Sequence, residues 1–496
     1  MRNNSNAIQA LWVGIGNLSS FALGLISAAI LSRYFDKTEY GTYRQILYVY
    51  HTLLVVFSGG LPRVFSYFLP RYELNQGWDI VWRVSKVLFL GGVFFSITLF
   101  SLSGIIADIL KNPELSRGLK YFSPVPMFLL PTLGIEGIFS TYRKTIYIAI
   151  YNTASRLLML MFIVLPVILF GGTYINAIYG WILVSFISLF IAVYFKRIPF
   201  LGLVNMKSGL SFKEILSYSL PLVSATIAGI AFRSANQFYI SRYFGPEVFA
   251  EFSNGFMEIP FVAMITSATS TVLMPVFSKI SHDKSDISQL TNMWRSALQK
   301  SAILIYPMVV FFMFYSKEVI ILVYSEAYLN SSLYFSTAMV LNFFNIIIFA
   351  PLLLAFGKVK FYARLHIGLA VSAWMIGYLM VLTFNSPISI AISHVIIAIC
   401  GILISLLYSA RIIRVTFWNL FPIGRFTLIA LHSVFSIMPV FLILRFVIPQ
   451  QEEIITLLFA VVGFLIILLL TSRLVGINYL GQLKQVVNLD KVRSKR

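Results

Sequence analysis

Residues 31–45 read LSRYFDKTEYGTYRQ, and they interrupt a long apolar run with two acids, three bases and three tyrosines. A similar stretch, ISRYFGPEVFAEF, occupies residues 240–252, where SRYF recurs without a change. Short aromatic matches are common in apolar chains, so this pair alone carries little weight. Its position directly after an apolar run in both cases nevertheless indicates an internal repeat.

The amino-acid composition is that of a chain that folds in a lipid bilayer. Of its 496 residues, 59% are hydrophobic and only 11% are charged, whereas soluble domains have about 45–50% apolar and about 25% charged residues. Apolar runs of about 20 residues are long enough to cross a hydrocarbon layer of ~30 Å as helices. A transmembrane barrel would instead show alternating segments of about ten residues. The sequence therefore predicts an all-α polytopic membrane protein.

Polar breaks divide the chain into apolar segments, which we expect to form about 14 transmembrane helices. The first segment is longer than the apolar core of a signal peptide, so we expect it to be retained as a helix. The expected limits are 7–31, 44–66, 84–107, 119–140, 145–170, 174–195, 215–241, 249–275, 298–324, 332–356, 362–384, 387–410, 424–446 and 454–472.

A second match supports the repeat, because LPRVFS at residues 61–66 and LMPVFS at residues 273–278 end corresponding helices. The two copies start six helices apart, and an even number preserves orientation across the membrane. We therefore expect two parallel six-helix lobes around a central cavity, related by an axis along the membrane normal, plus two C-terminal helices. The expected parts are an N-terminal lobe at 1–197, a cytoplasmic linker at 198–214, a C-terminal lobe at 215–411, two further helices at 412–473 and a basic cytoplasmic tail at 474–496.

The net charge of +20 is distributed unevenly between the loops. Placing the N-terminus in the cytoplasm puts most of the 38 Lys and Arg residues on the cytoplasmic side, which is the bias that sets the orientation of membrane helices. We therefore expect both termini to be cytoplasmic. The surplus of bases then faces the anionic headgroups of the lipid bilayer and not a nucleic acid.

The sequence lacks the motifs of nucleotide-driven or metal-dependent proteins. It contains no GxxxxGK[ST] phosphate loop, no HExxH and no carboxylate-rich metal motif. The single cysteine, Cys400, provides neither a disulfide framework nor a cysteine metal site. His51, His394 and His432 fall within predicted helices, where a single histidine is typical of a hydrogen-bonded core residue. We expect no cofactor, no metal and no catalytic residue, which argues against an ATP-driven pump.

The stretch AAILSRYFDKTEYGTY at residues 28–43, followed by a proline near the end of the next helix and then by a basic loop, resembles a known family. This is the polysaccharide-exporter family of the multidrug/oligosaccharidyl-lipid/polysaccharide exporter superfamily, which includes flippases for O-antigen and capsule repeat units. The resemblance implies a cavity between two lobes, a polyprenyl-pyrophosphate-linked oligosaccharide as substrate, and alternating access driven by H⁺ or Na⁺. It also implies a multi-pass location in the bacterial cytoplasmic (inner) membrane, with polysaccharide polymerase and chain-length proteins as candidate partners.

Two ionisable residues, Arg233 and Glu258, flank the predicted turn near Gly245 at similar distances along the chain. In a helical hairpin they would lie at equal depth and could form an ion pair. Charges within helices cost at least about 2.5–3.5 kcal/mol at the bilayer centre, so they usually face a cavity or a partner. Arg233 could bind the pyrophosphate while Glu258 holds a proton or cation. The alternative is a structural salt bridge between packed helices.

Four further residues are candidates for the cavity. Glu136 and Arg156 flank the cytoplasmic turn near Lys144 and have the same two interpretations, although Arg156 could also extend toward the cytoplasm. Arg44 and Arg63 lie near opposite ends of the second predicted helix. Each could contact the cavity or act as a solvated anchor at a helix end.

Other functions remain open at this point. A cation-coupled multidrug exporter of the same superfamily would favour acids in its cavity, whereas Arg and Glu are equally frequent within these helices. A flippase for a cell-wall lipid precursor would be close in mechanism. A membrane glycosyl polymerase or ligase typically has a large external loop with catalytic basic residues, which this sequence lacks.

Overall fold

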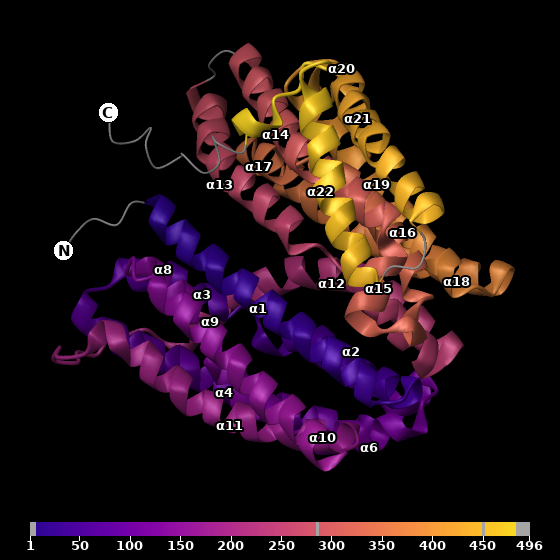
Figure 1. Cartoon of the computed structure of the whole chain (residues 1–496). Helices are drawn as coiled ribbons and strands as arrows, with labels where there is room; N and C mark the ends of the chain where they lie inside the picture. The colour runs from indigo at the N-terminus through magenta and orange to yellow at the C-terminus, as the bar shows by residue number, and fades with distance from the viewer. Residues whose placement is uncertain (1–5, 284–286, 449–451, 483–496) are drawn as a thin grey trace. The chain divides into compact units, whose positions relative to one another are not determined.

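The computed structural model describes residues 6–283, 287–448 and 452–482. Within these ranges the side chains of residues 6, 7, 10, 221, 222, 224, 225 and 283 are not described. Every regular element in the described residues is a helix (Figure 1). Most of the expected basic tail lies outside the described residues.

Twelve helices in the described part are long and apolar enough to cross a membrane. The count becomes thirteen if α16 (Ser331–Asn345) and α17 (Phe349–Ala355), which are bent by 41° at their break, form one span. The prediction of an all-helical polytopic membrane protein is therefore confirmed. The expected segment 215–241 lies in α12 (Phe212–Gly255), where several side chains are not described, so the count of fourteen stays a prediction.

The chain divides into two compact units, Met1–Ala250 and Glu251–Arg496, and α12 runs across the boundary. The expected lobe limits stay a prediction. The first unit contains most of α12 and, before it, α1 (Asn6–Tyr34), α2 (Lys37–Ser58), α3 (Pro62–Phe68), η1 (Leu69–Arg71), η2 (Leu74–Gln76), α4 (Gly77–Ser101), α5 (Ser103–Leu110), α6 (Pro113–Phe122), α7 (Val125–Leu129), η3 (Leu130–Thr132), α8 (Ile135–Thr141), α9 (Ile146–Met159), η4 (Leu160–Val164), α10 (Leu165–Phe170), α11 (Tyr174–Arg197) and η5 (Ile198–Phe200).

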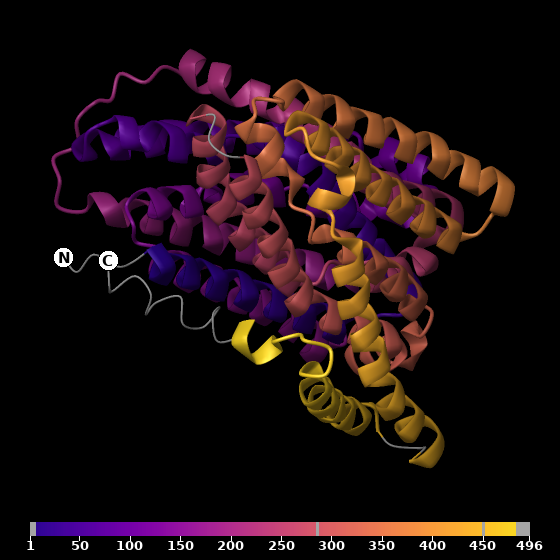
Figure 2. The ribbon, with the colours of Figure 1, turned by 90° about the horizontal axis from the view of Figure 1, so that it is seen from above.

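The second unit contains long helices and shorter pieces. Besides α16 and α17 these are α13 (Pro260–Asp283), α14 (Ile287–Phe314), α15 (Ser316–Tyr324), η6 (Glu326–Tyr328), α18 (Val359–Phe384), α19 (Pro387–Ile412), α20 (Phe417–Leu420), α21 (Ile423–Leu442), η7 (Ile443–Val447) and α22 (Glu453–Ser472). Helices α18 and α19 lie side by side in both views (Figures 1 and 2). His432 of α21 is a buried core histidine, as expected, because its ring nitrogens lie 3.0 Å from the Tyr479 hydroxyl and 2.9 Å from Thr471 Oγ1.

The expected fourth segment, 119–140, is not one continuous helix, because it is divided among α6, α7, η3 and α8. Proline lacks an N–H and clashes with the preceding turn, so Pro124 and Pro131 weaken the helix at two places. At Gly134 the backbone takes φ = 92°. A Cβ on Gly134 would lie 2.1 Å from a carbon of the Phe65 ring, so the break requires glycine.

A fully buried lysine contacts this break. Lys196, near the end of α11, is 1% exposed, and its Nζ donates hydrogen bonds to the Pro131 carbonyl at 2.7 Å and to Ser85 Oγ at 3.2 Å. The ammonium also lies 5.0 Å from the centre of the Phe65 ring. No carboxylate among the described residues pairs with it. Because helix ends leave carbonyls unsatisfied, the lysine supplies the hydrogen bond that the broken helix has lost.

The helix is interrupted at Gly245, where the turn between the expected seventh and eighth helices was predicted, and a second interruption follows before the eighth. Helix α12 continues to Gly255 through a non-helical kink at Gly245, where φ is 81° and ψ is 179°. A second break covers residues 256–259, and α13 begins only at Pro260. Proline favours the first position of a helix, which explains this start. The expected span 249–275 therefore begins later than predicted.

The two copies of the repeated sequence contact each other within the first unit. Thr38 Oγ1 donates a hydrogen bond of 2.8 Å to Glu247 Oε1, and these residues are 209 positions apart, which is the spacing of the repeat itself. A Cβ on Gly41 would lie 1.9 Å from the Pro246 carbonyl oxygen, so the start of α2 packs against backbone of α12. The two stretches that match in sequence are therefore in direct contact inside one unit.

A buried chain of amides and hydroxyls extends this contact. Gln45 Nε2 donates to Ser241 Oγ at 2.8 Å, and Asn112 Nδ2 donates to Gln45 Oε1 at 2.6 Å and to Thr42 Oγ1 at 3.0 Å. Gln45 and Ser241 are both 0% exposed. Buried polar groups that satisfy one another rigidify the packing around them.

Candidate substrate-binding cavity

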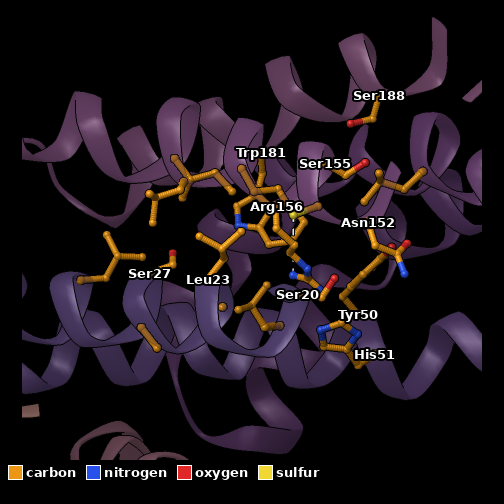
Figure 3. A pocket seen from close by; sticks show the side chains of 18 of the residues that line it. Ser20, Leu23, Ser27, Tyr50, His51, Asn152, Ser155, Arg156, Trp181 and Ser188 are labelled. Atoms are coloured by element: carbon orange, nitrogen blue, oxygen red, sulfur yellow. Dashed lines mark hydrogen bonds between the residues drawn. The ribbon is translucent and has the colours of Figure 1, made fainter. Parts of the chain in front are cut away.

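A cavity of about 550 Å³ lies within the first unit, among α1, α2, α9 and α11 (Figure 3). Volumes of about 300–1,000 Å³ are typical of sites for small molecules. The break at η3 and the π-helical turn η4 complete the lining. The polar residues that line the cavity are Asn17, Ser20, Ser27, Tyr40, Tyr43, Arg44, Tyr50, His51, Thr132, Tyr151, Asn152, Ser155, Arg156, Trp181 and Ser188.

Helical spacing brings these side chains to one place. On α2, Arg44, Leu47, His51 and Leu54 recur at intervals of three and four residues, which is the spacing of one helix face. Asn152, Ser155 and Arg156 form a similar face on α9. Helices α1 and α9 pack along each other.

The close approach of α1 and α9 depends on a glycine. A Cβ on Gly16 would lie 2.9 Å from the Cα of Ala149, so a larger residue there would separate the two helices. Polar residues of both helices line the cavity.

The cavity is cationic. Arg156 reaches into it, and its Nη1 donates to Met159 Sδ at 3.7 Å one turn further along α9 (Figure 3). Arg44 lines the same cavity, and both arginines lie close enough to His51 to act on it electrostatically. No Asp or Glu is among the described residues that line the cavity. Because guanidinium groups match phosphate oxygens in geometry and charge, this lining suits an anionic ligand.

Aromatic contacts fix two walls of the cavity. Trp181 Nε1 donates to the Tyr43 hydroxyl at 2.9 Å. The Tyr50 ring stacks on Phe95 with 5.8 Å between ring centres. These contacts hold the rings of Tyr43 and Tyr50 in position close to Arg156.

The structure thus brings two of the six predicted site residues, Arg44 and Arg156, into one cavity. Arg63 lines a separate, smaller hollow of about 160 Å³ together with Ser58, Val223 and Thr226. Glu136 is exposed on α8, and no ion pair joins it to Arg156 in the described part of the chain.

Arg233 and Glu258 fall in different units. Arg233 is exposed on the part of α12 that belongs to the first unit. Glu258 is exposed in the second unit, in the non-helical break between α12 and α13. The depth argument that paired them assumed a helix at Glu258, and their pairing stays a prediction.

Most of the polar residues that line the cavity were not recognised from the sequence as part of the site, and His51 and Ser188 are two examples. His51 was expected to be a core residue, but it is exposed to the cavity. Its distance of two helical turns from Arg44 is the signal that could have identified it. Ser188 lies in an apolar helix and carries no such signal.

The spans and the cavity among them define a polytopic membrane protein with a cationic internal cavity, and solved structures show the same fold. The lipid II flippase MurJ in an inward closed conformation superposes with a TM-score of 0.69 at 18% identity, covering 93% of this chain and 99% of MurJ. A multidrug resistance MATE family transporter in an inward-facing conformation superposes with a TM-score of 0.63 at 14% identity, covering 83% of this chain and 98% of that transporter. A transporter from Pyrococcus furiosus superposes with a TM-score of 0.57 at 15% identity, covering 82% of this chain and 95% of that transporter.

These structures share the transporter fold of the MOP (multidrug/oligosaccharidyl-lipid/polysaccharide) superfamily. The sequence identifies the family more narrowly, because residues 30–333 match the family described as polysaccharide biosynthesis protein, and the chain belongs to that family. No curated protein matches the chain. The resemblance inferred from residues 28–43 is therefore confirmed.

Proposed function

We propose that this protein moves polyprenyl-pyrophosphate-linked oligosaccharide repeat units across the bacterial cytoplasmic membrane, for the synthesis of O-antigen, capsule or exopolysaccharide. The observation that carries the proposal is the cavity that Arg44, His51 and Arg156 line and that has no carboxylate among its described lining residues. Membership of a polysaccharide biosynthesis family supports a glycan as the cargo.

The chemistry of such a substrate explains the cavity. A pyrophosphate carries its charge at the junction between lipid and sugars, so this junction is costly to move through hydrocarbon. Arg156 and Arg44 would neutralise it through charge-assisted hydrogen bonds, while the lipid tail stays in the bilayer. Alternating access between two lobes, coupled to H⁺ or Na⁺, would then expose the loaded cavity on the other side.

Two related functions are the alternatives. The fold of the lipid II flippase supports a cell-wall lipid precursor, which would use the same anion chemistry. The fold of the multidrug transporters supports drug export. The absence of acids from the described lining of the cavity argues against cationic drugs, because such drugs need a negative partner.

The test is genetic and biochemical. In a strain that lacks the gene, lipid-linked repeat units should accumulate on the cytoplasmic leaflet and surface glycan should disappear. Arg156→Ala should restore glycan at least roughly tenfold less well than the natural chain, since hydrogen bonds to charged groups contribute about 1.5–3 kcal/mol. Arg156→Lys should restore it partly. Arg117→Ala, which changes an exposed arginine of α6 outside the cavity lining, is the matched control.

The possible results separate the functions. Full activity of Arg156→Ala at normal abundance would remove this cavity from the proposal. Unchanged surface glycan with increased drug sensitivity in the deletion strain would favour a drug exporter. Accumulation of the cell-wall precursor would favour the lipid-precursor flippase.

A further inference from the structure

We propose that the neutral polar side of the cavity, formed by Thr132, Asn152, Ser155 and Ser188 and here named the hydroxyl subsite, binds the first sugar of the substrate, directly after the pyrophosphate. This inference rests on the proposed function, because it names which part of that substrate occupies which part of the cavity.

Ser188 provides the first argument. Its side chain is 2% exposed and lines the cavity, and its hydroxyl has no hydrogen-bond partner in the described part of the chain. A serine in a membrane helix usually donates to a carbonyl one turn earlier. Ser185 on the same helix does this with the Trp181 carbonyl. A buried hydroxyl without a partner costs about 1–3 kcal/mol, which a ligand hydroxyl would recover.

The other three residues of the subsite provide the second argument. Thr132 and Ser155 both lie beside the Tyr151 hydroxyl, and Asn152 precedes Ser155 by one helical turn. Hydroxyl and amide groups can both donate and accept hydrogen bonds, which is also true of the hydroxyls of a sugar ring. None of the four subsite residues is charged, so this side of the cavity offers nothing to neutralise a phosphate.

The position of the subsite relative to Arg156 provides the third argument. Ser155 directly precedes Arg156, and in Figure 3 Ser155 and Ser188 lie on the opposite side of Arg156 from His51. The first sugar is bonded directly to the pyrophosphate. A phosphate held by Arg156 therefore brings that sugar next to the hydroxyl subsite.

The size of the cavity limits what it can hold. Its volume of about 550 Å³ is that of a site for one small molecule. It suits a pyrophosphate with its first sugar and not a long oligosaccharide. The subsite would therefore recognise the start of the repeat unit, whatever sugars follow.

Binding to the full-length chain in lipid nanodiscs tests this inference. The two probes are polyprenyl diphosphate alone and polyprenyl diphosphate that carries a single hexose. The natural chain should bind the hexose form more tightly. Ser188→Ala should weaken binding of the hexose form roughly two- to tenfold, the loss expected for one net hydrogen bond, and leave the bare diphosphate unchanged. Ser155→Ala, on a different helix, should act in the same direction.

Ser185→Ala is the matched control, because it removes a buried hydroxyl of α11 that is bonded within the helix and is not part of the cavity lining. It should bind both probes like the natural chain. Equal affinity of the natural chain for the two probes, or equal weakening of both by Ser188→Ala and Ser155→Ala, would overturn the subsite. Failure of the natural chain to bind either probe would contradict the proposed function itself.

Discussion

Lys196 is a single buried cation that stabilises a break in a helix. Its hydrogen bonds reach the Pro131 carbonyl and Ser85, and Phe65 covers it from another side. The carbonyl is available because Pro131 and Gly134 end the regular helix at this point. The lysine therefore compensates a local loss of backbone hydrogen bonding, and it connects α11 to α3, α4 and η3.

Replacing Lys196 should lower stability without touching the cavity lining. Lys196→Met retains much of the volume but leaves the Pro131 carbonyl without its donor, so we expect the free energy of unfolding to fall by about 1–3 kcal/mol. Thermal unfolding of the purified protein in detergent would measure this as a lower midpoint temperature. Lys120→Met, at an exposed lysine of α6, should leave the midpoint unchanged. A midpoint for Lys196→Met equal to that of the natural chain would show that the lysine does not support the break.

At the scale of single residues, the sequence identified charged cavity residues better than it identified which polar side chains lie around them. Arg156 was a candidate because a guanidinium group within an apolar segment is costly. Arg44 was one because it lies at an end of the second predicted helix, and both arginines line the cavity. His51 was misjudged because it was considered alone and not as part of the helix face that carries Arg44. The unpaired hydroxyl of Ser188 could not be predicted, since it depends on which neighbours pack around it.

At the scale of elements, the repeated sequence acquires a structural meaning. The charged turn at residues 31–45 begins α2, where Asp36 accepts a hydrogen bond from the Glu39 amide at 2.8 Å and caps the helix. The same turn carries Thr38, Gly41 and Gln45, which contact the second copy. The duplication was predicted from sequence, but the contact between its copies was not, because identity between two stretches does not show that they touch.

A larger residue at Gly41 should open this contact. In Gly41→Ala the new Cβ would overlap the Pro246 carbonyl, so the start of α2 must move away from α12. Ser241, which is 0% exposed, should then become accessible. We expect Ser241→Cys, in a chain with Cys400→Ala, to react with maleimide several times faster when Gly41→Ala is also present.

Gly104→Ala is the matched control for this change. It adds the same methyl group on α5, where no atom lies within 4 Å of the new Cβ. The maleimide rate should then equal that of the parent. A rate that Gly41→Ala leaves unaltered would mean that the two copies do not pack as tightly as the structure indicates.

The interruptions of the helices were predicted less well than the helices themselves. Hydropathy is an average over a window, so the segments 119–140 and 332–356 each appeared as one span. The structure divides the first at its prolines and Gly134, and it bends the second by 41° between α16 and α17. Composition locates apolar length, whereas breaks depend on which packing partner accepts the freed backbone groups, as Lys196 does at Pro131.

At the scale of the whole molecule, the family, the transporter fold and the helical class agree with what the sequence implied. The orientation in the membrane still depends on the charge distribution alone. Asp108 and Glu114 accompany the turn between α5 and α6, whereas Arg143 and Lys144 follow α8. These turns lie at opposite ends of the first unit in Figure 1, as the labels of α6 and α8 show.

Two positions in these turns allow a direct test of orientation. Lys111 and Arg143 are both exposed and both have positive φ, of 53° and 55°, so a cysteine costs the backbone about the same at each. The candidate span Pro113–Thr141 separates them. Because bases gather on the cytoplasmic side, we expect Lys111→Cys in a chain with Cys400→Ala to react with a membrane-impermeant maleimide on intact cells. Arg143→Cys should react only in inverted vesicles. The opposite pattern would reverse the orientation, and labelling of both from one side would mean that residues 113–141 do not cross the membrane.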